Sequence, residues 1–170
     1  MKKILLLLMA MFAFGLQNAS AQDAPLKIVT GNPDLKVKVT QCSANGENVF
    51  IDLIITNMSE KDAGSYIWAA TFDGGSQYTE AFDDQGNRYY REGVYKDVVT
   101  FKVANQNSYI PDVSDLPLPS EVPVKLRIRI EGFSEKAESI AKFRLLLYCD
   151  ALGLNANNSI IIRNIPISRD

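Results

Sequence analysis

The chain has 170 residues, of which 46% are hydrophobic, 22% charged and 9% aromatic, with two cysteines and no histidine. The lack of histidine excludes the nucleophile systems that depend on it, histidine-ligated zinc and a histidine switch near neutral pH. Carboxylate chemistry, serine–lysine chemistry or no catalysis at all remain.

The first 21 residues have the pattern of a secretory signal peptide. Lys2 and Lys3 give a positive start, residues 4–15 form an apolar run, and residues 19–21 read Ala-Ser-Ala, a small-x-small cleavage signal. The apolar run is shorter than the roughly 20 residues of a membrane span, and no later run is long enough. We therefore expect cleavage after Ala21, no transmembrane segment in the mature chain, and a periplasmic or secreted bacterial protein.

Charge and length limit the remaining classes. Removing Lys2 and Lys3 from the 18 basic residues leaves 16 against 20 acidic residues, so nucleic acid is not an expected partner. The mature chain has the size of one domain. We expect residues 22–34 to be a loosely held lead-in and residues 35–170 to form that domain.

Hydrophobic patterning predicts strands through most of the mature chain. Alternating or continuous apolar runs cover residues 35–39, 49–55, 66–72, 98–103, 122–130, 143–149 and 160–167, and turn signals separate them. Residues 134–141 are the one helical candidate. Four prolines between residues 110 and 123 predict a crossing loop or an extended connection in place of a central strand. The fold class expected is an all-β, immunoglobulin-like antiparallel sandwich.

Three segments carry a resemblance to a known group. Residues 49–57 form a strand ending in Asn57, residues 81–89 contain Asp-x-x-Gly-x-x-Tyr, and residues 122–130 form a strand led by Val-Pro. In these features the chain resembles the small secreted immunoglobulin-like domains of bacteria, whose function is largely unassigned. The resemblance implies a β-sandwich and an extracytoplasmic location, and it brings no catalytic residue.

The two cysteines leave two alternatives open. Export to an oxidising compartment favours a disulfide between Cys42 and Cys149. Simple alternation, however, places Cys42 on the polar face of its strand and Cys149 on the apolar face of another, so a bulge would be needed to bring them together. The other alternative is two separate thiols. Neither cysteine has the neighbours of a metal ligand or a nucleophile.

Aromatic residues are concentrated between residues 66 and 109, and this clustering predicts a binding surface. Aromatic faces with polar neighbours suit sugar rings, although core packing is the alternative for each ring. The hypothetical ligand-binding set is Trp68, Tyr78, Tyr89, Tyr90, Arg91 and Tyr95.

Acidic residues crowd the same region, namely Asp73, Glu80, Asp83, Asp84, Glu92 and Asp97. Such residues on loops could hold calcium, but their spacing is not that of an EF-hand, and a solvated acidic rim is the alternative. We expect no metal site and no other cofactor. Two of the carboxylates could serve a glycosidase in principle, yet no catalytic motif is present.

A basic sheet face is the last feature predicted. If strand 122–130 forms a hairpin with the next strand, five cations share one face, which could hold an anionic polysaccharide or a lipid head group; the alternative is a solvated sheet face. The five are Lys125, Arg127, Arg129, Lys142 and Arg144.

The function expected from the sequence is a secreted, non-catalytic binding or adhesion module that recognises a glycan or an envelope protein. A structural subunit of an envelope complex is the first alternative, and it predicts an exposed apolar edge along residues 160–167. A small carbohydrate-active enzyme that uses Glu80, Asp83, Asp84 or Glu92 is the second.

Overall fold

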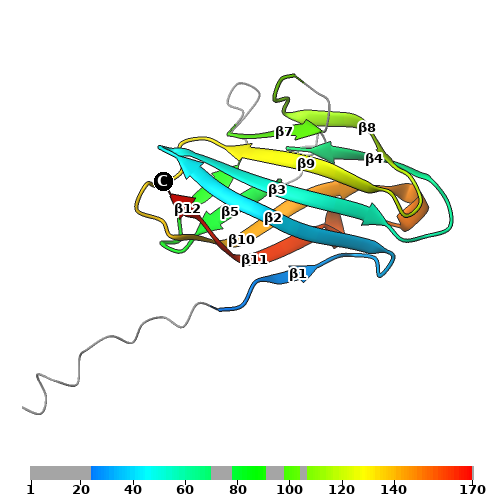
Figure 1. Cartoon of the computed structure of the whole chain (residues 1–170), viewed down its shortest axis with the longest axis horizontal. Coiled ribbons are helices and arrows are strands. Elements are labelled where there is room, and N and C mark those ends of the chain that lie inside the picture. Colours follow the sequence, from blue (N-terminus) through cyan, green and yellow to red (C-terminus); the bar gives the residue numbers. More distant parts are fainter. Residues whose placement is uncertain (1–23, 70–77, 91–97, 104–106, 170) are drawn as a thin grey trace, which may run out of the picture.

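The computed structural model describes residues 24–69, 78–90, 98–103 and 107–169 of the chain. They form two sheets whose strand pairs are almost all antiparallel, and Figure 1 shows one sheet lying over the other. This arrangement confirms the predicted all-β sandwich. The side of each sheet that points away from the other sheet is called its outer face below.

Sheet 2 has five strands in the order β12-β2-β3-β9-β7. Its strands are β2 (Leu35–Asn45), β3 (Asn48–Asn57), β7 (Val99–Val103), β9 (Pro123–Ile130) and β12 (Ser168–Arg169). The central strand β3 alternates strictly between buried and half-buried residues, which is the pattern of a strand with one face on the core.

Sheet 1 has seven strands around the long strand β10. Its strands are β1 (Lys27–Val29), β4 (Ala63–Trp68), β5 (Glu80–Asp83), β6 (Arg88–Tyr90), β8 (Asp112–Leu118), β10 (Ser139–Tyr148) and β11 (Ile160–Pro166). On one side β10 pairs with β11, and on the other it pairs first with β5 and then with β4. Two short 3-10 helices, η1 (Asp150–Leu152) and η2 (Ala156–Asn158), join β10 to β11.

The core lies between the inner faces of the two sheets. Sheet 2 contributes Ile51, Leu53 and Ile128, and sheet 1 contributes Phe143 and Ile162, all at most 1% exposed. Burial of such side chains from water is the main force that holds the sheets together. Each sheet therefore also has an outer face that does not contribute to this core.

The predicted helix at residues 134–141 is wrong. Residues 134–138 form a turn, and β10 begins at Ser139. The Arg169 guanidinium donates hydrogen bonds to the carbonyls of Ser134 and Ala137, while the Glu138 amide donates to Asp84. These long-range partners use the backbone groups that a helix would need, and they outweigh the local preference.

The proline-rich segment is extended, but it is not only a connection. It contains β8, which lies at the end of sheet 1 and pairs with β4, so a missing proline donor does not interrupt a central ladder. The lead-in also differs from expectation, because its residues Lys27 to Val29 pair with Ile161 to Arg163 of β11.

In the part of the chain that the structure describes, there is no helix with the length and apolar character needed to cross a membrane.

Candidate functional site

The outer face of sheet 1 carries a first group of aromatic rings at the end of β4 and β10. Alternation along β4 buries Ser65 and Ile67 completely and turns Tyr66 and Trp68 outward. The Trp68 ring centroid lies 6.3 Å from that of Tyr66 and 4.6 Å from that of Tyr148. We call these three rings the first aromatic cluster.

The first aromatic cluster also covers apolar surface outside the core. Leu146 lies directly opposite Trp68 and is fully buried, although it points to the outer face and does not belong to the core between the sheets. Tyr66, in contrast, is 41% exposed. The cluster is therefore anchored underneath and accessible at its rim.

A second aromatic cluster lies on the same face over β5 and β6. The Tyr78 and Tyr90 ring centroids are 5.0 Å apart. The Arg88 guanidinium carbon lies 4.2 Å from the Tyr90 centroid and 5.5 Å from that of Tyr78. Such cation–π contacts hold an arginine flat on aromatic rings. This cluster thus presents two rings and a positively charged plane.

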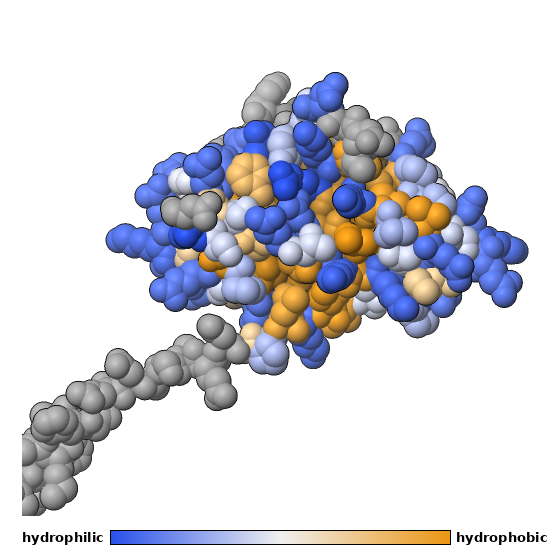
Figure 2. Space-filling model, viewed as in Figure 1, coloured by the Kyte–Doolittle hydropathy of each residue, from blue (hydrophilic) through white to orange (hydrophobic). Residues whose placement is uncertain are grey.

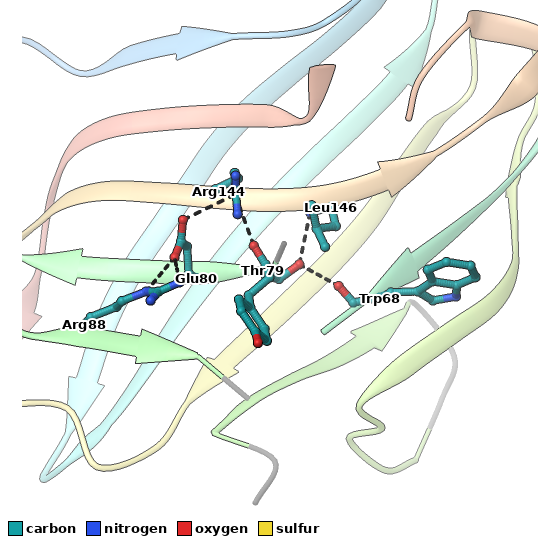
Figure 3. A network of polar contacts seen from close by, with 7 residues as sticks. Trp68, Thr79, Glu80, Arg88, Arg144 and Leu146 are labelled. Atoms are coloured by element: carbon teal, nitrogen blue, oxygen red, sulfur yellow. Dashed lines mark hydrogen bonds and ion pairs between the residues drawn. The ribbon is translucent and has the colours of Figure 1, made fainter. Parts of the chain in front are cut away.

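A polar network joins the two aromatic clusters, as Figure 3 shows. The buried Thr79 hydroxyl donates to the Trp68 carbonyl at 2.7 Å and accepts from the Leu146 amide at 3.0 Å. It thereby connects β4, β5 and β10 at the point where β10 changes partner. The Trp68 carbonyl and the Leu146 amide both need a hydrogen-bond partner when buried. Because the Thr79 hydroxyl serves both, it fixes the position of the first aromatic cluster relative to the second.

Glu80 is the charged centre of this network. Its carboxylate receives Arg88 at 2.7 Å and Arg144 at 3.3 Å, and its side chain is only 6% exposed. Arg144 also donates to the Tyr78 carbonyl at 3.1 Å. A buried carboxylate that receives two guanidinium groups is committed to structure, and it positions Arg88 against the aromatic rings.

The β5–β6 hairpin is closed by Asp83. Its carboxylate accepts from the amides of Gln85 and Asn87, from the Asn87 side chain and from the Tyr89 hydroxyl, at 2.8–3.0 Å. Burial on its own would raise the pKa of Asp83, but the hydrogen bonds from Asn87, Tyr89 and Gln85 outweigh it and lower the pKa. The hairpin that carries Arg88 and Tyr90 is therefore held by an ionised group.

The predicted ligand-binding set divides into three parts. Trp68, Tyr78 and Tyr90 all lie on the outer face of sheet 1. Tyr89 instead stacks at 4.3 Å on the fully buried Phe133 and packs against the core. Arg91 and Tyr95 lie outside the described residues.

Three residues of this face were missed from the sequence, namely Tyr66, Tyr148 and Arg88. The sequence did contain a signal for Tyr66, because it stands two residues before Trp68 and residues two apart on a strand share a face. Tyr148 required the pairing of β10 with β4, which lie about 80 residues apart and carry no local signal of it.

The predicted basic sheet face does not exist as one surface. β9 pairs with β3 and β7 in sheet 2, while β10 belongs to sheet 1. Lys125, Arg127 and Arg129 therefore lie on one outer face of the sandwich, and Lys142 and Arg144 on the other. The expectation assumed that consecutive strands form a hairpin, but the chain crosses between the sheets after residue 130.

The acidic residues do not form one site. Glu80 and Asp83, three residues apart on β5, project to opposite sides of sheet 1, so they cannot flank one glycosidic bond. Asp84 accepts from the Glu138 amide. Asp73, Glu92 and Asp97 lie outside the described residues, and among the residues described no three acidic or cysteine side chains are grouped to hold a metal.

Both cysteines are buried, and the structure has no bond between them. The bulge that would turn Cys42 inward is present, as the register of β2 on β3 shifts between Val39 and Gln41. Burial, and then the charge of Asp52, raise the pKa of the Cys42 thiol to about 12.

Comparison with models of known protein families finds no match to this chain, and neither does comparison with curated proteins. The resemblance to secreted immunoglobulin-like domains therefore stays a prediction, and the functional argument depends on the site itself.

Proposed function

We propose that the protein is a secreted, non-catalytic binding module of immunoglobulin-like fold that recognises a glycan through the outer face of sheet 1. The observation that carries the proposal is the pair of aromatic clusters on that face, joined by the Thr79 and Glu80 network. Sugar rings stack their apolar faces on aromatic rings, and their hydroxyls accept and donate hydrogen bonds.

The arrangement favours binding over catalysis. Within the part of the chain that the structure describes, the carboxylate at the centre of the face is that of Glu80. It is already held by Arg88 and Arg144, so it has no role left as an acid or a nucleophile. A rigid set of rings whose positions are fixed before binding loses little conformational entropy on complex formation. Arg88, which lies over the Tyr90 ring, supplies donors for sugar hydroxyls next to that ring.

The test is a glycan array with the mature protein, followed by titration of the best sugar into variants. Trp68→Ala and Tyr90→Ala should each weaken binding about tenfold or more, as for aromatic anchors in other interfaces. Tyr109→Ala is the matched control, because Tyr109 packs on Phe50 over the outer face of sheet 2 and should leave binding unchanged. Full binding by folded Trp68→Ala and Tyr90→Ala variants would overturn the proposal.

A second candidate, an assembly subunit, is favoured by one open edge. Among the described residues, β12 pairs only with Ser43 and Ala44, so residues 35–41 of β2 have a strand on one side only. A hollow of about 480 Å³ lies beside this edge and is lined by Ile28, Val37 and Ile54 among others. Figure 2, which views sheet 2 from outside, shows hydrophobic residues gathered in the middle and lower part of this face.

This edge differs from the one expected along residues 160–167, because β1 pairs with β11 there. It also carries Lys36 and Lys38 and a bulge, which are devices that discourage strand addition. We therefore place assembly second. A monomer in light-scattering measurements at high concentration would count against it, whereas a stable oligomer that dissociates in a Val37→Lys variant would favour it.

A further inference from the structure

One row of side chains crosses five strands of sheet 1 on its outer face. Lys27 of β1 lies opposite Arg163 of β11, and Arg163 lies opposite Lys142 of β10. Lys142 in turn lies opposite Phe82 of β5, and Phe82 lies opposite Arg88 of β6. We call these five residues the cationic row. It begins in the lead-in segment and ends at the second aromatic cluster.

Three of the four cations in the cationic row have no carboxylate partner among the described residues. Among the described residues, the ion pairs with carboxylates involve only arginines 88, 127, 129 and 144, and Glu80 is shared by two of these. Lys27, Arg163 and Lys142 therefore have no carboxylate partner there. Like charges directly opposite one another on neighbouring strands are destabilising, so their placement in register indicates a requirement other than folding.

The geometry of the row selects the kind of anion. Neighbouring strands are about 4.8 Å apart, so the row from β1 to β6 spans about 19 Å. A single small anion would neutralise one or two of these cations, whereas an extended chain with repeated negative charges matches all of them. The whole chain has a net charge of −2. This local concentration of cations therefore attracts a polyanion to the row in preference to the rest of the protein surface.

An aromatic ring is set into the same row. The Lys142 ammonium nitrogen lies 5.5 Å from the Phe82 ring centroid, and the Arg88 guanidinium carbon lies 5.8 Å from it on the other side. Cations on both sides of an apolar ring suit a sugar ring that carries an acidic substituent. The Tyr78 and Tyr90 rings continue this surface beyond Arg88.

We propose that the cationic row binds an anionic polysaccharide, laid across the strands of sheet 1, with its carboxylate or sulfate groups against Lys27, Arg163 and Lys142. This inference rests on the proposed glycan-binding function, and it names the chemical class of the glycan. The sugar rings stack on Phe82 and the second aromatic cluster, and the acidic groups set the register.

The test uses the mature protein and three probes, namely heparin as a sulfated chain, polygalacturonate as a carboxylated chain and dextran as a neutral chain. Wild-type protein should bind at least one anionic probe and not dextran, and binding should weaken with salt. The double variant Lys142→Gln/Arg163→Gln should lose about tenfold or more in affinity. Its salt dependence should become shallower, which a merely structural change would not cause.

A matched control is available on the other face of the sandwich. Lys38 and Lys125 lie on either side of Ile54 in sheet 2 and likewise have no carboxylate partner among the described residues. The double variant Lys38→Gln/Lys125→Gln removes the same charge and should leave affinity within about twofold of wild type. Circular dichroism melting curves should show that both double variants are folded.

The outcomes separate the two proposals. Loss of binding in the Lys38→Gln/Lys125→Gln variant alone would assign the polyanion to sheet 2 and overturn the inference. Binding to dextran that needs Trp68 but not Lys142 and Arg163 would overturn the inference and leave the glycan-binding function standing. Binding to none of the probes, together with a silent glycan array, would overturn both.

Discussion

The two outer faces of the sandwich use similar residues in different ways. On sheet 1, the carboxylate of Glu80 is 6% exposed and lies between two arginines beneath aromatic rings. On sheet 2, the carboxylate of Asp52 receives Arg127 at 2.5 and 2.6 Å, but the side chains are 22% and 49% exposed. Both are acidic residues at the centre of a sheet face. Only the first is enclosed.

The difference between the faces is one of enclosure. Sheet 1 carries two aromatic clusters that cover Leu146 and Thr79, both fully buried although they are outside the core cluster. Sheet 2 carries long cations beside apolar residues, with a hollow of about 480 Å³ whose lining includes Ile54, Lys102 and Lys125. Water screens exposed pairs, so charge on sheet 2 is largely solvated, whereas on sheet 1 it fixes side chains in place. A fixed arrangement is what selective recognition requires.

Neutralising the two carboxylates in turn should show the largest contrast. Glu80→Gln leaves two guanidinium groups without their counter-charge in an enclosed site, and it should destabilise the protein by about 3 kcal/mol. Asp52→Asn breaks a pair open to solvent and should cost about 0.5 kcal/mol. Urea unfolding of both variants measures the difference.

Arg88 is itself 39% exposed, so water screens part of the destabilisation expected for Glu80→Gln. The ratio of the losses in unfolding free energy for Glu80→Gln and Asp52→Asn is therefore more informative than either loss alone. Equal losses for Glu80→Gln and Asp52→Asn would show that enclosure does not distinguish the faces. A Glu80→Asp variant, which keeps the charge and shortens the reach, should lie between them.

Acid should weaken the β5–β6 hairpin through Asp83. The pKa of this carboxyl is lower in the folded protein than in the unfolded chain, so its contribution is present above about pH 4 and is lost as the pH falls through the folded value. Asp83→Asn should lose about 2 kcal/mol at pH 7, the value of hydrogen bonds to a charged group.

The pH dependence supplies the control for this second prediction. The stability difference between wild type and Asp83→Asn should shrink as the pH is lowered below about 4, because the wild-type carboxyl then takes up a proton. Denaturant titrations at a series of pH values measure it. A difference that stays constant down to pH 2 would mean that the ionised form of Asp83 does not hold the hairpin.

Local pattern was enough to predict the layers of this protein. The alternation of Val124, Leu126, Ile128 and Ile130 with Lys125, Arg127 and Arg129 encodes a strand with one wet face, and β9 has that form. Clustering in the sequence grouped Trp68, Tyr78, Tyr89 and Tyr90 as candidate ligand-binding residues and left core packing as the alternative for each. Trp68, Tyr78 and Tyr90 lie on one outer face, whereas Tyr89 packs against the core. Period-two alternation is a property of a single strand, so a single sequence reveals it.

Pairing between distant strands could not be predicted in the same way. Lys142 was grouped with Lys125, yet its neighbours are Arg163 and Phe82, because β9 and β10 belong to different sheets. Lys27 was assigned to a loose lead-in although it begins the cationic row. These contacts depend on how the whole chain buries its apolar faces, and no local signal specifies them.

The bulge in β2 leads to the last and smallest predicted effect. It turns Cys42 inward, where burial and the charge of Asp52 raise the pKa of the thiol to about 12. At pH 8 the native protein should therefore react negligibly with a thiol reagent, since Cys149 is fully buried as well. Unfolding in urea without a reductant should release two reactive thiols. Release of none would mean that the inward turn of Cys42 serves a disulfide with Cys149.

The raised pKa of Cys42 also makes stability depend on pH. The free energy of unfolding should fall as the pH rises above about 9, because the thiol of the unfolded chain ionises there while the folded Cys42 thiol keeps its proton.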